Sequence, residues 1–295
     1  MYNFSVIIPH KNTPDLLQRC LNSIPHRDDL QVIVVDDNSD KVDFSNFPGL
    51  NRPDTEIIFS KGDKGKGPGY ARNYGISKAQ GRWIIFADAD DYFNKSFNDA
   101  LEEYKDAKEE IIFFKCTLQK ENNEILDYAL VNDAIDDAKK NGNTDAIVYG
   151  VPLPVAKFIK RDFIQKHTIR YQEITGGDDI IFSIRMAIKL KLFALSEYRL
   201  YCVVERPGSL TRNNQWQSFY SYVLACCDAY ELLKTVNKEK LAINWTISWW
   251  GFLWAENKFQ ALILVPRIYS TMGIKRGSSC IKKGMKRGEW NWRDN

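Results

Sequence analysis

Histidine, paired cysteines and long apolar runs are scarce or missing in this chain of 295 residues. It has three histidines, and its six cysteines form no Cys-x-x-Cys pair and follow no regular spacing. A zinc site or a disulfide framework is therefore not indicated. No uninterrupted apolar run reaches about 18 residues, so no membrane-spanning helix is expected. The N-terminus lacks the basic segment and apolar stretch of a signal peptide, and we expect a cytoplasmic protein.

Charge is unevenly distributed along the chain. The formal net charge is +3, yet residues 275–295 carry seven basic side chains against two acidic ones. The positive charge is therefore local to the tail. Nucleic-acid-binding domains spread basic residues over a whole face, so this pattern argues against a nucleic-acid partner. With 44% apolar and 27% charged residues, the composition is that of an ordinary globular protein.

Short apolar runs alternate with segments of helical periodicity before residue 213. Strands are expected at Phe4–Ile8, Leu30–Val35, Glu56–Ser60, Trp83–Ala87, Glu110–Phe114 and Tyr198–Val204. Helices are expected after Pro14, at Tyr70–Ala79, at Asn94–Lys108 and from Asp178 to about Leu190. This alternation is typical of βαβ units and predicts an α/β fold around a mostly parallel sheet.

Two stretches interrupt the alternation. Residues 117–150 are polar and weakly periodic, which predicts an insertion with an irregular loop around Asn141–Asn143. Residues 61–69 hold four glycines and three lysines, which predicts a flexible loop with cations for phosphate groups.

Carboxylates directly follow two of the expected strands. Asp36 and Asp37 follow the second strand, and Asp88, Asp90 and Asp91 follow the fourth. Asp88 and Asp90 point the same way on an extended backbone, where they repel each other unless a cation lies between them. Open α/β sheets bind ligands at the carboxyl ends of their strands, so these residues mark the expected site. The alternative is that Asp90 or Asp91 only caps the following helix.

A third acidic pair, Asp178 and Asp179, opens an expected helix after two glycines. Its simplest role is to complement the helix dipole. Together with the other carboxylates, and with Arg72 and the lysine-rich loop as cations, it provides what a nucleotide-sugar site requires: groups for a metal ion, a base, a hydroxyl and phosphates.

Five segments together resemble inverting glycosyltransferases of family 2, which have the GT-A fold. They are Ser5–Asn12, Val35–Ser39, Gly69–Gly75, Ala79–Tyr92 and Gly177–Phe182. They occur in the family's order over roughly residues 3–212. The resemblance implies a Rossmann-like, mostly parallel central sheet flanked by helices, in a GT-A domain over residues 1–212. Residues 213–295, outside the match, are expected to form a helical, aromatic-rich extension with a basic tail.

The resemblance assigns donor-binding roles by position. Pro9, Lys11, Asp36 and Asp37 would bind the nucleotide base of a nucleotide-sugar donor. Asp37 is the first choice for the base, because a carboxylate can accept the N3–H of uracil. The resemblance implies UDP as the nucleotide, with GDP or dTDP as alternatives. The alternative for either aspartate is a turn cap. Arg72 would lie near the phosphates, or would be an exposed helix arginine paired with a carboxylate.

The resemblance also assigns the chemistry. Asp88 would face the ribose and the metal, and Asp90 would ligate a divalent ion, Mn²⁺ or Mg²⁺, that bridges the two phosphates. Asp91 would cap the next helix. Asp179 would be the catalytic base that takes the proton of the acceptor hydroxyl during an in-line, inverting displacement. Asp178 would orient the acceptor.

The loop that closes over the diphosphate in the family corresponds to Arg206–Arg212. It often carries a histidine, but no histidine of this chain follows residue 167, and Arg206 stands nearby. Two other functions fit less well. A sugar-nucleotide nucleotidyltransferase would carry a glycine-rich loop after the first strand, where this chain has no glycine until Gly49. An inactive GT-A scaffold or partner protein would have no chemical reason to keep both Asp90 and Asp179.

The C-terminal third holds seven of the eight tryptophans, followed by the basic tail. Aromatic side chains beside a Lys/Arg cluster favour peripheral contact with an anionic membrane. That contact would suit a glycan or lipid-linked acceptor at the inner face of the plasma membrane, in cell-surface polysaccharide synthesis. The alternative is a helical subdomain that packs its tryptophans on the core or against a second subunit of a homodimer.

Overall fold

The computed structural model describes residues 2–60, 67–174, 176–206 and 216–288. By its internal contacts the chain divides into two units, each described by itself below. The first unit is Met1–Glu173 with Lys189–Arg206, and the second is Ile174–Ile188 with Pro207–Asn295. The contact division therefore groups residues 174–188 with the C-terminal helices, while the boundary after residue 212 stays a prediction.

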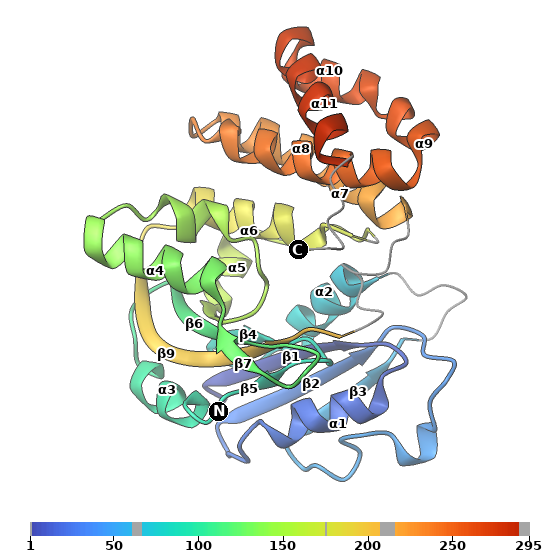
Figure 1. Ribbon diagram of the computed structural model, residues 1–295. Helices are drawn as coiled ribbons and strands as arrows, with labels where there is room; N and C mark the ends of the chain where they lie inside the picture. Colours follow the sequence, from blue (N-terminus) through green and yellow to red (C-terminus); the bar gives the residue numbers. More distant parts are fainter. Residues whose placement is uncertain (1, 61–66, 175, 207–215, 289–295) are drawn as a thin grey trace. The chain divides into compact units, whose positions relative to one another are not determined.

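The first unit is built on one mixed sheet. Within the described residues, nine strands join it in the order β3-β2-β1-β4-β8-β6-β9-β5, with β7 paired to β6 (Figure 1). The strands are β1 Phe4–His10, β2 Leu30–Asp36, β3 Thr55–Phe59, β4 Trp83–Phe86, β5 Tyr92–Phe93, β6 Ile111–Gln119, β7 Ile125–Asp127, β8 Lys157–Lys160 and β9 Phe193–Val204. The pairs β3–β2, β2–β1, β1–β4 and β6–β9 are parallel, and β8, β5 and β7 run antiparallel to their neighbours.

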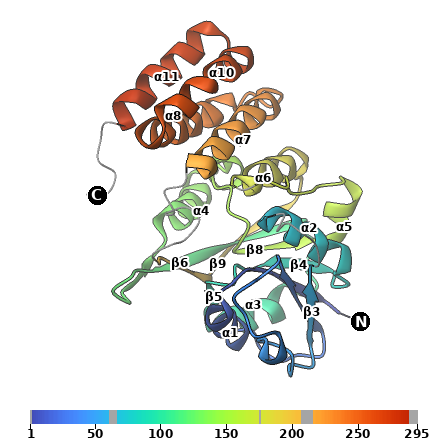
Figure 2. The ribbon, with the colours of Figure 1, turned by 90° about the vertical axis from the view of Figure 1, so that its right-hand side faces the viewer.

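The predicted α/β class and all six expected strands are confirmed. Every residue of β2 is buried, and β1 is buried except at Pro9, which is half-buried. Strands covered on both faces read as continuous apolar runs, which is why the sequence showed them clearly. Helix α2 (Pro68–Lys78) covers one face, and α1 (Pro14–Asn22) and α3 (Phe97–Tyr104) cover the other (Figures 1 and 2).

Helix α2 is held close to the sheet. A Cβ atom on Gly75 would lie 2.3 Å from Cγ2 of Ile7, so only glycine permits this approach of α2 to β1. On the same helix, the buried Asn73 side chain exchanges two hydrogen bonds with the Tyr171 backbone, at 2.9 and 3.0 Å. These contacts fix the position of Arg72 in the first unit.

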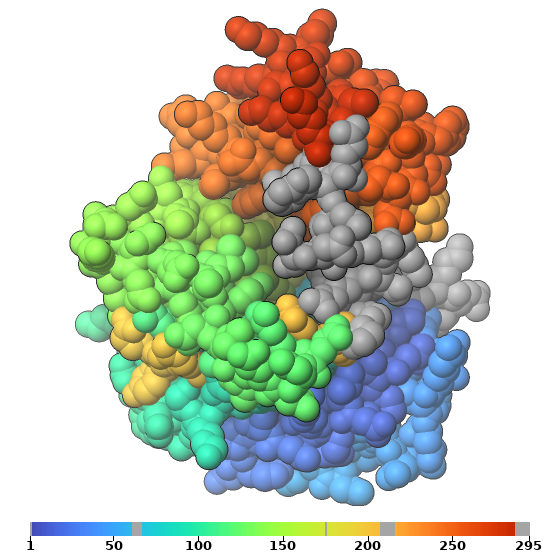
Figure 3. All heavy atoms as spheres, in the orientation of Figure 1, coloured from blue at the N-terminus to red at the C-terminus, as the bar shows by residue number. Residues whose placement is uncertain are grey.

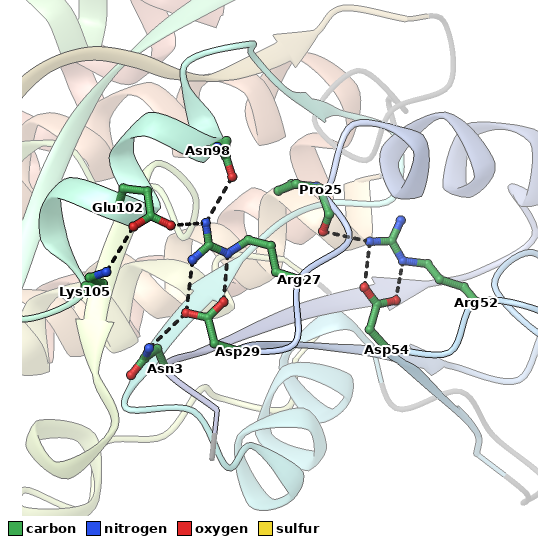
Figure 4. Close-up of polar contacts among 9 residues, drawn as sticks. All are labelled: Asn3, Pro25, Arg27, Asp29, Arg52, Asp54, Asn98, Glu102 and Lys105. Carbon is green, nitrogen blue, oxygen red and sulfur yellow. Dashed lines mark hydrogen bonds and ion pairs between the residues drawn. The ribbon is translucent and has the colours of Figure 1, made fainter.

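Two Arg-x-Asp clamps precede β2 and β3 at the amino ends of these strands (Figure 4). Arg27 donates to both oxygens of Asp29, at 2.8 and 3.1 Å, and Arg52 donates to both oxygens of Asp54, at 2.7 and 3.1 Å. Arg52 also donates to three carbonyl oxygens at and beyond the end of α1, those of Leu21, Ile24 and Pro25. The clamp therefore provides donors for carbonyls that lack an intrahelical partner.

The expected irregular loop is present at residues 142–144, but the rest of the insertion is more regular than the sequence indicated. Residues 117–150 contain the end of β6, strand β7, helix α4 (Ala129–Asn141) and a π-helical turn at Ala146–Gly150. They form part of the surface of the first unit (green in Figure 3). The buried residues of α4 recur at helical spacing and include Val131, Ala134, Ile135 and Ala138. This apolar stripe is narrow and is surrounded by charged residues, so the helix was hard to recognise from the sequence.

The second unit is helical. Besides α6 (Asp178–Lys189), its described helices are α7 Trp216–Lys234, α8 Glu239–Glu256, α9 Lys258–Ile263, α10 Val265–Met272 and α11 Ile274–Gly288. Helix α8 packs against both α7 and α11. Trp250 is buried and donates from Nε1 to the Ala261 carbonyl at 3.1 Å, and Trp249 stacks on Tyr222 at 3.9 Å between ring centroids. These tryptophans therefore pack inside the helical unit.

No helix in the described part of the chain is long and apolar enough to span a membrane. All six cysteines are free and buried.

Candidate active site

The ends of three neighbouring parallel strands bring most first-unit candidates to one edge of the sheet. In the pairing of β1 with β2, Pro9 lies opposite Val35 and His10 opposite Asp36. On its other side β1 pairs in parallel with β4. Residues that follow these strands therefore lie at the shared carboxyl edge, where open α/β sheets bind ligands.

His10 and Asp36 form a buried hydrogen bond, with 2.8 Å between Nδ1 and Oδ1. The Thr13 backbone N–H donates to Nε2 of the same ring at 3.1 Å. Because a backbone N–H can only donate, Nε2 is the acceptor and Nδ1 carries the proton. The hydrogen-bond network therefore assigns a neutral His10 that donates to Asp36.

The carboxylate of Asp36 is engaged by protein donors on both oxygens. Besides His10, it accepts hydrogen bonds from the backbone N–H of Ser39, at 2.9 Å, and from the Ser39 hydroxyl. Burial raises the pKa of Asp36, but the hydrogen bonds from His10 and Ser39 outweigh burial and hold the pKa below its ordinary value. The observed contacts of Asp36 are structural, and its contact with a nucleotide base stays a prediction.

Asp37 is buried beside this network. Its Oδ2 accepts a hydrogen bond from the backbone N–H of Gly67 at 3.0 Å, which ties the end of β2 to the start of α2. Of the other two predicted base contacts, Pro9 is half-buried and Lys11 is exposed.

Asp88 is paired with Arg72, the arginine that was predicted to lie near the phosphates. Arg72 donates from Nη2 to Oδ1 of Asp88 at 2.6 Å. The arginine is buried, with its guanidinium over the Tyr171 ring at 5.3 Å, so it is not the exposed helix residue of the alternative interpretation. The backbone N–H of Asp88 donates to the Tyr201 hydroxyl at 2.8 Å.

Asp90 is held by a second arginine. Arg206 donates from Nε to Oδ2 of Asp90 at 2.7 Å, and its Nη2 lies 2.6 Å from the same oxygen in an ion pair. Arg19 donates to the backbone carbonyl of Asp90, and its guanidinium lies over the Tyr92 ring at 5.5 Å. Three arginines therefore surround the carboxylates that follow β4.

Asp91 does not cap the next helix, and that prediction was wrong. Helix α3 begins at Phe97 with Ser96 as its N-cap residue, whereas Oδ1 of Asp91 accepts from the Val204 backbone N–H at 2.8 Å. Burial, and then the charges of Asp88 and Asp90, raise the pKa of Asp91 well above its ordinary value. Asp91 therefore links the β4 loop to β9 as a buried carboxyl group.

The donor set fits a divalent ion that is completed by a substrate. Among the described residues, no cluster of three or more His, Cys, Asp or Glu could hold a metal. Asp88 and Asp90 each use one oxygen for an arginine, and neither Oδ2 of Asp88 nor Oδ1 of Asp90 has a hydrogen-bond partner in the described residues. Mg²⁺ commonly binds one or two carboxylates, several waters and the substrate's phosphates. Two hard oxygen ligands match that pattern.

Asp178 and Asp179 lie in the second unit, as the first two residues of α6. Asp178 is buried and Asp179 is half-buried. The preceding Gly177 has a positive φ of 80°, and a Cβ there would lie 3.0 Å from both the Ala225 Cβ and the Tyr222 ring. Residue 177 therefore has to be glycine both for its backbone conformation and for lack of space next to α7. This glycine precedes the acidic pair.

Three segments named in the sequence analysis lie at least partly outside the described residues. They are residues 61–66 of the lysine-rich loop, residues 207–215, which include all but the first residue of Arg206–Arg212, and residues 289–295 of the basic tail.

An α/β sheet whose parallel strands end in a carboxylate cluster has the general form of a ligand-binding edge. The family model described as "Glycosyl transferase family 2" matches residues 5–168, more than half of the chain. The chain therefore belongs to glycosyltransferase family 2.

Curated relatives carry the names of glycosyltransferases. The chain is 25% identical over 218 residues to a poly(ribitol-phosphate) beta-glucosyltransferase of Bacillus spizizenii, covering 69% of this chain and 32% of that protein. It is 22% identical over 249 residues to the poly(ribitol-phosphate) beta-N-acetylglucosaminyltransferase TarS of Staphylococcus aureus, covering 82% and 41%. A Campylobacter jejuni undecaprenol-linked beta-1,3-glucosyltransferase is 32% identical over 126 residues, covering 42% and 41%. The chain thus spans well under half the length of these relatives.

Solved structures resemble the whole chain. The crystal structure of residues 1–349 of S. aureus TarS with UDP-GlcNAc has a TM-score of 0.69 at 18% identity, covering 98% of this chain and 89% of that one. The same protein with UDP has a TM-score of 0.64 at 16% identity, covering 99% and 93%. At such identities the likeness concerns the fold alone, and it confirms the predicted GT-A fold with a helical C-terminal region.

Sequence reasoning missed the residues that surround the carboxylates. The Tyr201 hydroxyl accepts a hydrogen bond from the Asp88 backbone, and Arg19 donates to the Asp90 carbonyl. The Val204 backbone N–H donates to the carboxyl group of Asp91. None has a local sequence signal, because each reaches the site from a distant element. Arg206 was noticed only as a neighbour of the missing histidine.

Proposed function

We propose that this protein transfers a sugar from a nucleotide sugar, UDP-sugar as the first expectation, to a hydroxyl of a glycan or lipid-linked acceptor, with inversion at the anomeric carbon. The observation that carries the proposal is the placement of Asp37, Asp88 and Asp90 at one carboxyl edge of a parallel sheet in a family 2 chain. Cell-surface polysaccharide synthesis is the proposed setting, because relatives are named for poly(ribitol-phosphate) and undecaprenol-linked substrates.

The nucleotide would bind at the ends of β1 and β2. Asp37 would accept the N3–H of uracil, with Pro9 and Lys11 on the other side of the base. Asp36 supports this surface through His10 and Ser39, since its own oxygens already accept three donors. Buried, hydrogen-bonded groups of this kind hold a binding surface in one geometry.

The diphosphate would lie at the end of β4. Asp90, with Asp88, would hold Mn²⁺ or Mg²⁺, and such an ion supplies stabilisation of the negative charge that develops on the leaving nucleoside diphosphate. Arg72 is bonded to Asp88 and lies within the same charged cluster, so it would hold Asp88 in place and add positive charge near the phosphates.

The second unit would supply the base. Asp179 would take the proton from the acceptor hydroxyl while its oxygen attacks the anomeric carbon opposite the leaving group. One base and one in-line displacement give inversion. Asp178, at the start of the same helix, would orient the acceptor.

The C-terminal helices would contact an anionic membrane at the cytoplasmic face. Phe259, Leu262 and Ile263 are exposed on one side of α9, and Ile274 is exposed at the start of α11. Lys275, Lys282, Lys283 and Lys286 are exposed on α11. Apolar side chains with nearby lysines are typical of peripheral membrane helices. Flotation with anionic vesicles tests this proposal, and a concentration-dependent dimer without flotation would instead favour a homodimer through α9.

Calorimetric titration with UDP, GDP and dTDP, each with and without Mn²⁺, tests the donor site. We expect UDP binding that Mn²⁺ strengthens and that Asp37→Asn and Asp90→Asn each weaken. Hydrolysis or transfer from a panel of UDP-sugars then identifies the sugar. Binding of no nucleotide under any condition would refute the proposed function and favour an inactive GT-A protein.

A further inference from the structure

The side chain of Asp90 is held by a guanidinium group. Arg206 donates from Nε to one carboxylate oxygen at 2.7 Å, and its Nη2 lies 2.6 Å from the same oxygen. The side chains of Arg206 and Asp90 are only 28% and 24% exposed, so the pair is shielded from water more than a surface ion pair. Arg206 therefore neutralises the residue that we propose as the main metal ligand.

The charge around Asp90 is already balanced by the protein. Arg72 pairs with Asp88 at 2.6 Å, and Arg19 donates to the Asp90 backbone carbonyl. A divalent cation that approaches the two carboxylates is attracted by them but repelled by three guanidinium groups at close range. The chain's own cations therefore oppose metal binding as long as no further anion is present.

We propose that Arg206 competes with the divalent ion for Asp90 in the nucleotide-free protein, and that the donor's diphosphate ends this competition by accepting the Arg206 guanidinium. This inference rests on the proposed function. A guanidinium binds phosphate oxygens in the same forked geometry that it uses for a carboxylate. Arg206 can thus exchange one anion for the other without losing its hydrogen bonds.

The exchange couples the two ligands. Nucleotide removes a cation from Asp90 and so raises metal affinity, and by linkage the metal raises nucleotide affinity by the same factor. In this scheme Arg206 acts on the metal through Asp90 in the nucleotide-free protein, and it contacts the diphosphate once the donor is bound. The site would hold metal firmly only when a nucleotide diphosphate is present.

Titration of Mn²⁺ followed by electron paramagnetic resonance of the free ion tests the coupling, using the full chain with and without UDP. We expect wild type to bind Mn²⁺ weakly alone and more tightly with UDP. Arg206→Gln should bind Mn²⁺ alone about tenfold more tightly than wild type and should show a smaller enhancement by UDP, because only the part that the phosphate ligands contribute then remains. Arg206→Lys keeps the charge without the fork and should lie between the two.

Arg199→Gln is the control, since Arg199 also pairs with an aspartate, Asp127, away from the proposed ligands. It should behave as wild type. Equal or weaker Mn²⁺ binding by a folded Arg206→Gln protein, without UDP, would overturn the competition. If UDP binds but Mn²⁺ binds to no variant, Arg206 is the resident cation and the competition is again overturned, while the donor site stands. If UDP binds to no variant, the proposed function itself fails.

Discussion

Nδ1 of His10 lies 2.8 Å from Oδ1 of Asp36, joining the ends of the parallel strands β1 and β2 by a buried hydrogen bond. The bond from the Thr13 N–H to Nε2 continues this link into α1. The two strand ends that border the proposed base site are therefore fixed to each other by side chains as well as by the sheet. The two adjacent aspartates thus have different roles. Asp36 holds the strand ends together, and Asp37 is proposed to contact the base.

Asp36→Asn should destabilise the first unit by about 1–3 kcal/mol, because the amide nitrogen would face buried donors and leave hydrogen bonds unmade. Urea unfolding followed by circular dichroism measures the change. Asp106→Asn, at a side chain that is 84% exposed, is the control and should have little effect. An unchanged urea midpoint for Asp36→Asn would show that the His10–Asp36 bond contributes nothing to stability.

The stability difference between wild type and Asp36→Asn should depend on pH. The pKa of Asp36 is lower in the folded protein than its ordinary value, so the unfolded chain binds this proton more tightly. The contribution of Asp36 is therefore present above the unfolded pKa of about 4 and is lost as pH falls through the folded pKa. Unfolding free energies measured between pH 6 and pH 3 should converge at the acid end. A constant gap would contradict this assignment.

The fold was predictable where a residue pattern is compatible with only one kind of secondary structure. The runs that became β1, β2 and β4 are buried on both faces, and continuous apolar strands between helical segments leave few other solutions. Helix α4 was missed because its buried stripe of small side chains, such as Ala134 and Ala138, is a weak signal among lysines and aspartates. The clamps at Arg27 and Arg52 depend on loop geometry that sequence spacing does not define.

Arg52→Lys should cost about 2–4 kcal/mol of stability, whereas Arg199→Lys should cost less than about 1 kcal/mol. Both arginines form a forked pair with an aspartate. The Arg52 pair is 9% and 11% exposed and also satisfies three carbonyls, while the Arg199 pair is 48% and 56% exposed. Lysine offers one ammonium and cannot reach all these acceptors. Equal changes in urea midpoint for the two variants would show that burial does not determine how much the Arg52–Asp54 pair contributes to stability.

Gly177→Ala should destabilise the protein more than Gly142→Ala. Both glycines have positive φ, at 80° and 71°, so both substitutions incur the strain of a left-handed alanine, about 1 kcal/mol. A Cβ at Gly142 meets nothing within 4 Å, but one at Gly177 meets Ala225 and Tyr222 at 3.0 Å. Thermal unfolding compares the two variants. We also expect transfer to fall in Gly177→Ala alone, because this turn places Asp178 and Asp179 at the start of α6; equal activities would count against their proposed roles.

The site was less predictable than the fold for a related reason. The aspartates after β2 and β4 were found because strand ends and carboxylates can be read locally, whereas their partners arrive from other elements. Asp91 is an example. An aspartate before a helix is typical of an N-cap, but the carboxyl group of Asp91 accepts a hydrogen bond from the Val204 N–H of β9 instead. Tertiary hydrogen bonds of this kind override local preference and become visible only in the folded chain.

Asp179→Asn should abolish transfer while leaving donor binding intact. An amide keeps the size of the side chain but cannot accept the acceptor's proton, and loss of a general base costs about 10²–10⁴ in rate. The measurements are kcat for transfer and the Kd of UDP with Mn²⁺. Asp90→Asn provides the opposite control, because it should weaken binding of metal and nucleotide before any proton moves. Normal turnover by Asp179→Asn would remove Asp179 from the base role. Loss of UDP affinity in that variant would instead assign it to the donor site, and the proposed base would then have to be sought among the other carboxylates of the second unit.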